Sequence, residues 1–158
     1  MKVSSFEVDH DRLLQGVYVS RIDEVGAEKV TTFDLRMKVP NCEDVLSNGG
    51  IHTIEHLMAV YLRTKAGSFS DQVLYVGPMG CRTGMYLILK GLCEPKDIIE
   101  ILIKLFEHIE NFEGAVPATT SIECGNYRDH NLEDAKKEAK AYLEVLRNIT
   151  EENMVYPK

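Results

Sequence analysis

The sequence has no long apolar run, no excess of basic residues and no closely spaced pair of cysteines. No stretch approaches the roughly 18 consecutive apolar residues of a membrane-spanning helix, and the first residues, MKVSSFE, contain no apolar signal core. With 18 Lys and Arg against 25 Asp and Glu, the net charge of −7 disfavours binding to nucleic acid or to an anionic membrane surface. We therefore expect a cytoplasmic protein with neither type of partner.

The four cysteines are too dispersed for a zinc site made of cysteine alone, because none belongs to a C-x-x-C pair. In a chain without an export signal they should be reduced thiols. Cys42 and Cys93 lie in ordinary contexts and are interpreted as structural. Cys81 lies in a glycine-rich turn, and Cys124 lies at the end of a predicted strand, directly before Gly125.

The 158 residues, 44% of them hydrophobic and 27% charged, fit one globular domain over residues 1–158, without repeats or linkers. Alternating polar and apolar residues over 29–39 predict an antiparallel strand with one wet face, on which Arg36 lies. We expect an α+β fold in which helices pack on one face of a curved antiparallel sheet. The predicted strands cover 16–22, 29–39, 73–76, 85–90 and 119–124, and the predicted helices 51–65, 95–111 and 132–147.

The most informative stretch is HTIEHL at 52–57, which holds two histidines four residues apart with a glutamate before the second. On a helix, His52, Glu55 and His56 project from one face. Two imidazoles at this spacing bind one metal ion, and the carboxylate beside them acts as a proton carrier rather than a ligand. H-x-x-E-H is the inverted form of the zinc-protease signature.

The segment 77–84 contains three glycines and one proline around Cys81, which indicates a tight and unusual backbone path. A cysteine in the middle of such a turn is not typical core filler. The adjacent Arg82 would favour its thiolate, which is the reactive form.

Two histidines leave a metal ion under-coordinated, and Cys124, directly before Gly125, is the better candidate for a third ligand. A His, His, Cys set suits Zn²⁺, Fe²⁺ or Co²⁺ with one open position. Two alternatives remain: a metallopeptidase, which predicts an acidic third ligand, and a structural metal site, which predicts four protein ligands.

Five motifs in order resemble the S-ribosylhomocysteine lyase (LuxS) family, from residue 4 to about residue 132. They are SFEVDH at 5–10, FDLR at 33–36, HTIEHL at 52–57, PMGCRTG at 78–84 and ECG at 123–125. The resemblance implies a LuxS-like fold and a homodimer with both active sites at the subunit interface. It also implies one divalent metal per subunit, Fe²⁺ with Zn²⁺ or Co²⁺ able to replace it, held by His52, His56 and Cys124.

The implied reaction splits S-ribosyl-L-homocysteine into L-homocysteine and 4,5-dihydroxy-2,3-pentanedione, the autoinducer-2 precursor of quorum sensing, within the activated methyl cycle. Two enolisations move the sugar carbonyl before the thiolate is eliminated, with Cys81 and Glu55 as catalytic proton carriers. The resemblance further places around the substrate Ser5 and His10, both from the partner subunit, and Arg36, Arg63 and Gly125.

The chain departs from the family pattern at Tyr75, six positions before Cys81, where the family often has an acidic residue. That acid is expected near the amino group of the substrate, so recognition of the homocysteine end is in question. Gly77, where serine is expected, is a milder change.

Overall fold

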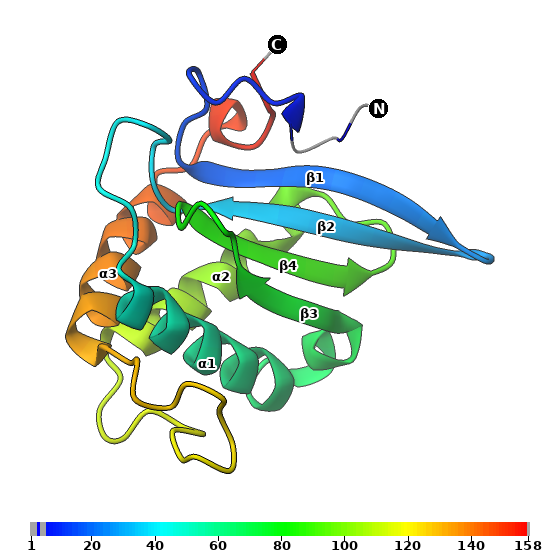
Figure 1. Cartoon of the computed structure of the whole chain (residues 1–158). Coiled ribbons are helices and arrows are strands. Elements are labelled where there is room, and N and C mark those ends of the chain that lie inside the picture. Colours follow the sequence, from blue (N-terminus) through cyan, green and yellow to red (C-terminus); the bar gives the residue numbers. More distant parts are fainter. Residues whose placement is uncertain (1–2, 4–5, 158) are drawn as a thin grey trace.

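The computed structural model of the chain describes residue 3 and residues 6–157 (Figure 1). The strands are β1 (Gly16–Val25), β2 (Glu28–Arg36), β3 (Val73–Pro78) and β4 (Gly84–Lys90), and they form one antiparallel sheet in the order β1-β2-β4-β3. The helices are α1 (Asn48–Thr64), α2 (Pro95–Glu110) and α3 (Leu132–Arg147), with short 3₁₀ turns η2 (Gly67–Gln72) and η3 (Glu151–Asn153). The predicted α+β class and antiparallel sheet are confirmed.

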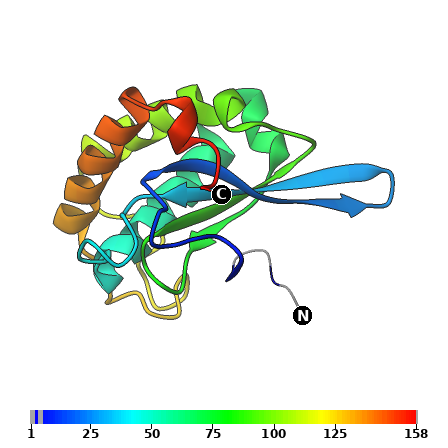
Figure 2. The same cartoon turned by 90° about the horizontal axis from the view of Figure 1, so that it is seen from above.

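The helices cover one face of the sheet, as Figure 2 shows, and the core lies between the two layers. Alternate residues of β2, including Phe33 and Leu35, are fully buried on this face, as their period-2 pattern predicts. The apolar stripe of α2 packs against the same core and against Tyr142 of α3, whose ring meets that of Phe106 edge-on at 4.9 Å.

The opposite face of β2 is covered where residues 34 and 36 lie, which differs from the wet face predicted for this strand. Asp34 and Arg36 are 1% and 3% exposed. The carboxyl-terminal segment folds over them, and Tyr156 stacks on Tyr18 with ring centroids 4.9 Å apart while its hydroxyl donates to Asp34 Oδ2 at 2.7 Å. A buried ion pair is tolerated here because hydrogen bonds satisfy its remaining polar atoms.

Helix α1 begins at Asn48, three residues before the predicted start, so the two glycines lie inside its first turn. The Ser47 side chain caps the helix by accepting from the Gly50 amide at 3.1 Å. A Cβ at Gly49 would lie 3.1 Å from the Cβ of Asn131, the residue that caps α3. Glycine therefore lets the starts of α1 and α3 approach each other closely, and does not break the helix.

The predicted strand at 119–124 is wrong, because residues 111–131 form a loop of consecutive turns between α2 and α3. Threonine side chains stabilise these turns: Thr119 Oγ1 donates to the Val116 carbonyl and Thr120 Oγ1 donates to the Glu123 carboxylate. The Cys124 amide donates to the Thr120 carbonyl at 3.0 Å. No strand in the described part of the chain pairs with this segment, so local hydrogen bonds shape its turns.

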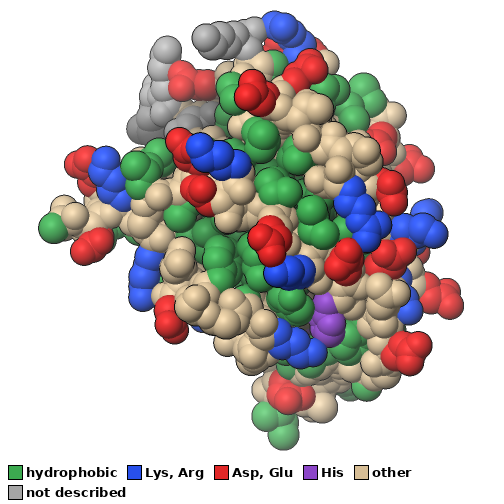
Figure 3. Space-filling view, turned by 180° about the vertical axis from the view of Figure 1, so that it is seen from behind, with side chains coloured by type: hydrophobic (Ala, Val, Ile, Leu, Met, Phe, Trp, Pro, Cys, Tyr) green, Lys and Arg blue, Asp and Glu red, His purple; other side chains and the backbone are tan. Residues whose placement is uncertain are grey.

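Among the described residues, no helix combines the length and the apolar character needed to cross a bilayer. On the side opposite to that of Figure 1, acidic and basic side chains are interspersed around small hydrophobic areas (Figure 3).

Candidate active site

Four metal-binding side chains converge where the first turns of α1 meet the loop 111–131, which crosses beside that end of the helix in Figure 1. Their donor atoms all lie within 4.8 Å of one another, and each side chain is half-buried. They belong to His52, His56, Cys124 and His130. Three of the four are the predicted ligands, so the structure brings together a helix and a loop residue about seventy positions apart in the chain.

The rings of His52 and His56 are oriented by backbone carbonyls of the loop. His52 Nδ1 lies 2.8 Å from the Asp129 carbonyl oxygen, and His56 Nδ1 lies 2.9 Å from that of Pro117. Because a carbonyl only accepts, each Nδ1 carries a proton, so that Nε2 is the nitrogen available to a metal ion. This carbonyl-histidine arrangement is typical of metal ligands.

His130 is a fourth member of the cluster that the sequence reasoning missed. Thr53 Oγ1 donates its proton to the Gly49 carbonyl at 2.8 Å and lies 3.1 Å from His130 Nδ1, so that nitrogen is the donor of the pair. His130 Nε2 is buried and has no hydrogen-bond partner among the described residues. In the sequence, the feature that could have pointed to His130 as a ligand is its position six residues after Cys124, directly before the residue that caps α3.

The electrostatic environment keeps His130 neutral. Burial, followed by the nearby His52 and His56, lowers its pKa, and its ring stacks on that of His52 with centroids 3.9 Å apart. A neutral imidazole is the form that offers a lone pair to a metal ion. The orphaned Nε2 therefore fits a site made to receive a cation.

The Cys124 sulfur completes a donor set of the right dimensions. Its Sγ lies 3.5 Å from His52 Nε2. Tetrahedral bonds of about 2.05 and 2.3 Å to nitrogen and sulfur place such ligands about 3.6 Å apart. The residues therefore fit a single divalent ion with one soft and several imidazole donors.

Glu55 lies on α1 between the two histidines and is half-buried. Its carboxylate is not among the clustered donor atoms. Within the described part of the chain, the donor cluster therefore lacks the acidic third ligand that a metallopeptidase would have.

A second group of predicted residues lines a cavity of about 250 Å³ on the polar face of the sheet. His10, Arg36 and Cys81 all border it, together with Tyr86 and Tyr156. Cys81 is exposed at the turn between β3 and β4. The cavity thus presents a reactive sulfur, a guanidinium and an imidazole to the same volume.

The cation beside Cys81 is Arg36 and not the adjacent Arg82. The Arg82 guanidinium donates to the Leu46 carbonyl at 3.2 Å, whereas Arg36 Nη1 lies 4.0 Å from Cys81 Sγ. Burial opposes ionisation of the thiol, but hydrogen bonds from Thr83 and the nearby Arg36 outweigh it, so the pKa of Cys81 is lowered. The expected thiolate therefore has a structural basis.

Arg36 is fixed by the buried carboxylate of Asp34. Two hydrogen bonds of 3.1 and 2.6 Å join the guanidinium to both carboxylate oxygens. The remaining nitrogen, Nη1, donates to Thr83 Oγ1 at 2.7 Å. Arg36 is thus oriented toward the Cys81 turn by its own strand.

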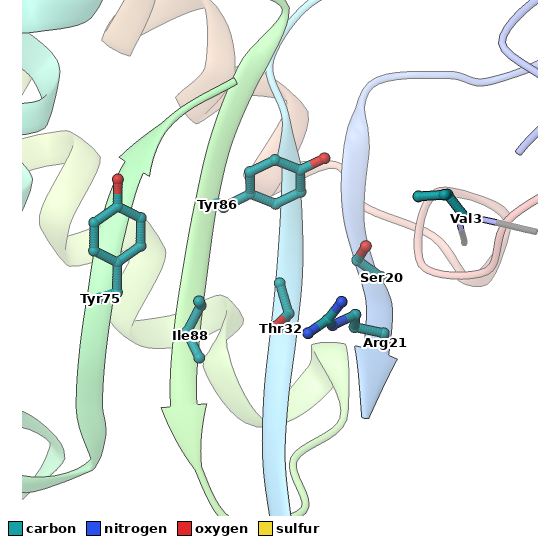
Figure 4. Close-up of a pocket in the computed structure, with 7 residues that line it drawn as sticks. All are labelled: Val3, Ser20, Arg21, Thr32, Tyr75, Tyr86 and Ile88. Atoms are coloured by element: carbon teal, nitrogen blue, oxygen red, sulfur yellow. The ribbon is translucent and has the colours of Figure 1, made fainter. Parts of the chain in front are cut away.

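Tyr75 borders a neighbouring cavity of about 230 Å³ on the same face, to which all four strands contribute (Figure 4). A Cβ at Gly77 would overlap the Tyr75 hydroxyl and lie 2.7 Å from its Cε1. The tyrosine ring occupies the space of a side chain at position 77. The two departures from the family pattern are therefore linked, since a side chain at position 77 would require the Tyr75 ring to move.

The other predicted substrate-binding residues belong to neither group. The Arg63 guanidinium donates to the Leu74 carbonyl at 3.1 Å, about 10 Å along the helix axis from His56. Gly125 is exposed with open space around its α-carbon. Ser5 lies outside the described residues. The metal cluster and the Cys81 cavity have no residue in common.

Comparison with known proteins agrees with this geometry. Residues 3–153 match the family model described as S-ribosylhomocysteinase (LuxS). Similar proteins include the S-ribosylhomocysteine lyases of Phocaeicola vulgatus (52% identity, 98% of this chain and 96% of the relative) and Finegoldia magna (48%, 99% of each). That of Porphyromonas gingivalis is 51% identical over 99% of this chain and 98% of its own length. The chain therefore belongs to the S-ribosylhomocysteinase (LuxS) family.

Proposed function

We propose that the protein cleaves S-ribosyl-L-homocysteine into L-homocysteine and 4,5-dihydroxy-2,3-pentanedione, the autoinducer-2 precursor, and that it does so in the cytoplasm. The observation that carries this proposal is the convergence of His52, His56 and Cys124 in a chain that belongs to the LuxS family. The thioether is a poor leaving group until a carbonyl stands beta to it, so the carbonyl must first move along the sugar by two enolisations.

A divalent ion held by these donors would supply Lewis-acid stabilisation of the negative charge that develops on the sugar oxygens. The chain itself must supply proton carriers with a suitable pKa. We assign the first carbon-to-carbon transfer to Cys81, whose thiolate is favoured by Thr83 and Arg36. We assign the later transfer and the elimination to Glu55, which directly precedes His56 on α1 and is not one of the cluster donors.

We further propose that the active unit is a homodimer with its sites at the interface. Within one chain the metal cluster and the Cys81 cavity have separate linings, so a second copy would bring them together. Large hydrophobic side chains stand exposed beside both groups: Phe6 is 84% exposed and Ile122 is 95% exposed. Covering these side chains would stabilise the dimer, and light scattering of the purified protein measures its mass.

In that assembly we place Ser5 and His10 of the amino-terminal segment, with Arg36, Arg63 and Gly125, around the substrate. His10 already borders the Cys81 cavity in the single chain, with its Nδ1 2.8 Å from the Val8 carbonyl oxygen. The physiological ion is proposed to be Fe²⁺, with Zn²⁺ or Co²⁺ able to substitute. Anaerobic purification followed by elemental analysis tests its identity.

One observation supports the alternative of a structural metal site: His130 offers a fourth donor. A permanent fourth ligand would close the coordination shell, whereas the lyase requires an open position. The direct test is to incubate the metal-loaded protein with S-ribosylhomocysteine and assay for a free thiol. Cys81→Ala and Glu55→Gln are the controls. Absence of thiol release from a folded, metal-loaded dimer would overturn the proposed function.

A further inference from the structure

The Cys81 sulfur has a close polar neighbour on its own turn, the hydroxyl of Thr83. Thr83 Oγ1 lies 3.1 Å from Cys81 Sγ, nearer than the Arg36 guanidinium at 4.0 Å. Thr83 is 5% exposed, so water does not readily replace its hydroxyl. The contact is short for a hydrogen bond that involves sulfur, and it connects Cys81 to the buried ion pair behind it.

The direction of the hydrogen bond follows from the groups around the hydroxyl. Arg36 Nη1 can only donate, so at 2.7 Å it occupies a lone pair of Thr83 Oγ1. The hydroxyl proton is then directed to another acceptor, and the Cys81 sulfur is the neighbour within reach. A thiolate accepts this hydrogen bond better than a thiol does. If the thiol instead donated to Thr83, the Thr83 hydroxyl proton would be left without this acceptor.

We propose that Thr83 is a positioning residue for catalysis: its hydroxyl, oriented by Arg36, donates to the Cys81 thiolate and holds the sulfur toward the substrate cavity. Arg36 thus acts on Cys81 mainly through Thr83, and Asp34 acts by fixing Arg36. This inference rests on the proposed role of Cys81, but its consequence for the sulfur is measurable without any turnover.

Among the described residues, the side-chain hydrogen bonds of the Cys81 sulfur are with Thr83 and Arg36. Burial, followed by the Asp34 charge, raises the pKa of Tyr86 and of Tyr156, so both phenols stay neutral near pH 7. The hydroxyl of Tyr156 donates to Asp34. The charged and titratable groups around the sulfur are Asp34, Arg36, Tyr86, Tyr156 and His10, with the Arg82 side chain directed away to the Leu46 carbonyl.

The test is the pH dependence of alkylation of Cys81 by iodoacetamide in the metal-loaded protein, followed by mass spectrometry of the Cys81 peptide. Thr83→Val keeps the shape and removes the hydroxyl, so the thiol pKa should rise and alkylation near pH 6 should slow roughly tenfold. Thr83→Ser keeps the hydroxyl and should stay within about twofold of the parent. The exposed Cys42 serves as the internal reference for the reagent.

Thr83→Ala provides a second variant without the hydroxyl in case valine prevents folding, and circular dichroism confirms the fold of each. A Cys81 profile in Thr83→Val or Thr83→Ala that superimposes on that of the parent would overturn the proposal. So would an equal shift in Thr83→Ser. If the parent protein releases no thiol from S-ribosylhomocysteine but the Cys81 alkylation profile still shifts in Thr83→Val, the proposed function is refuted. The hydrogen bond from Thr83 to Cys81 is then still supported.

Discussion

Gly77→Ser is expected to destabilise this protein although serine is the residue expected at that position in the family. A Cβ at position 77 would overlap the Tyr75 hydroxyl and lie 2.7 Å from its Cε1, so the tyrosine must move. Tyr75 is 50% exposed, which means that it buries about 100 Å² of the roughly 200 Å² of a tyrosine. At about 25 cal/mol per Å², this burial contributes at most about 2.5 kcal/mol.

Because a displaced ring keeps part of its contacts, we expect a loss of about 1 to 2 kcal/mol in the free energy of unfolding. For a domain of this size the melting temperature should fall by roughly 2 to 8 °C. The Michaelis constant should rise as well, since Tyr75 lines the cavity next to that of Cys81 and Tyr86 borders both. Urea unfolding and steady-state kinetics of the purified variant measure both effects.

A double-mutant cycle with Tyr75→Ala isolates the steric cause. In the alanine background the space over residue 77 is empty, so Gly77→Ser should cost less than about 0.5 kcal/mol. Tyr75→Asp with Gly77→Ser restores the family pair and should fold as well as the parent. An equal cost of serine in both backgrounds would show that the two positions are independent and that the reasoning is wrong.

Three further outcomes follow from the site. Glu55→Gln should keep the metal but lower product formation at least 100-fold, because it removes a proton carrier and not a ligand; metal loss on elemental analysis would show that Glu55 coordinates. His56→Ala should lose the metal. His130→Ala should still bind one Co²⁺ per chain, but about 10- to 100-fold more weakly than the parent. If a competition titration shows that both variants lose Co²⁺ binding to the same extent, His130 is a permanent ligand. Asp34→Asn should cost about 3 to 5 kcal/mol in urea unfolding because Arg36 stays buried without its carboxylate, and a loss below about 1 kcal/mol would contradict this.

The predicted ligands were accessible from the sequence because local geometry fixed two of them. A helix forces His52 and His56 onto one face whatever else the chain does. Cys124 was identified from the chemistry of a third donor and from the resemblance, even though the strand assigned around it is a series of turns. His130 was missed because its place in the cluster depends on the path of a loop, which no periodicity describes.

The polar face of the sheet shows a second feature that sequence alone does not predict. Alternation placed Arg36 correctly on the face opposite the core, but alternation cannot show what covers that face. The covering residue is Tyr156, 120 positions later in the chain, whose hydroxyl donates to Asp34. A buried ion pair and a solvent-exposed one have the same sequence pattern, because burial depends on segments that are distant in the sequence.

The sequence by itself determined the approximate positions of the three helices and of the four strands of the sheet, the paired histidines and the family, since these depend on local periodicity, on spacing and on motif order. Only the tertiary structure decided which carbonyls orient the imidazoles, which arginine lies beside Cys81 and which side chain lies over Gly77. Each of these depends on a contact between atoms a few ångströms apart, and the packing of the whole chain fixes such contacts.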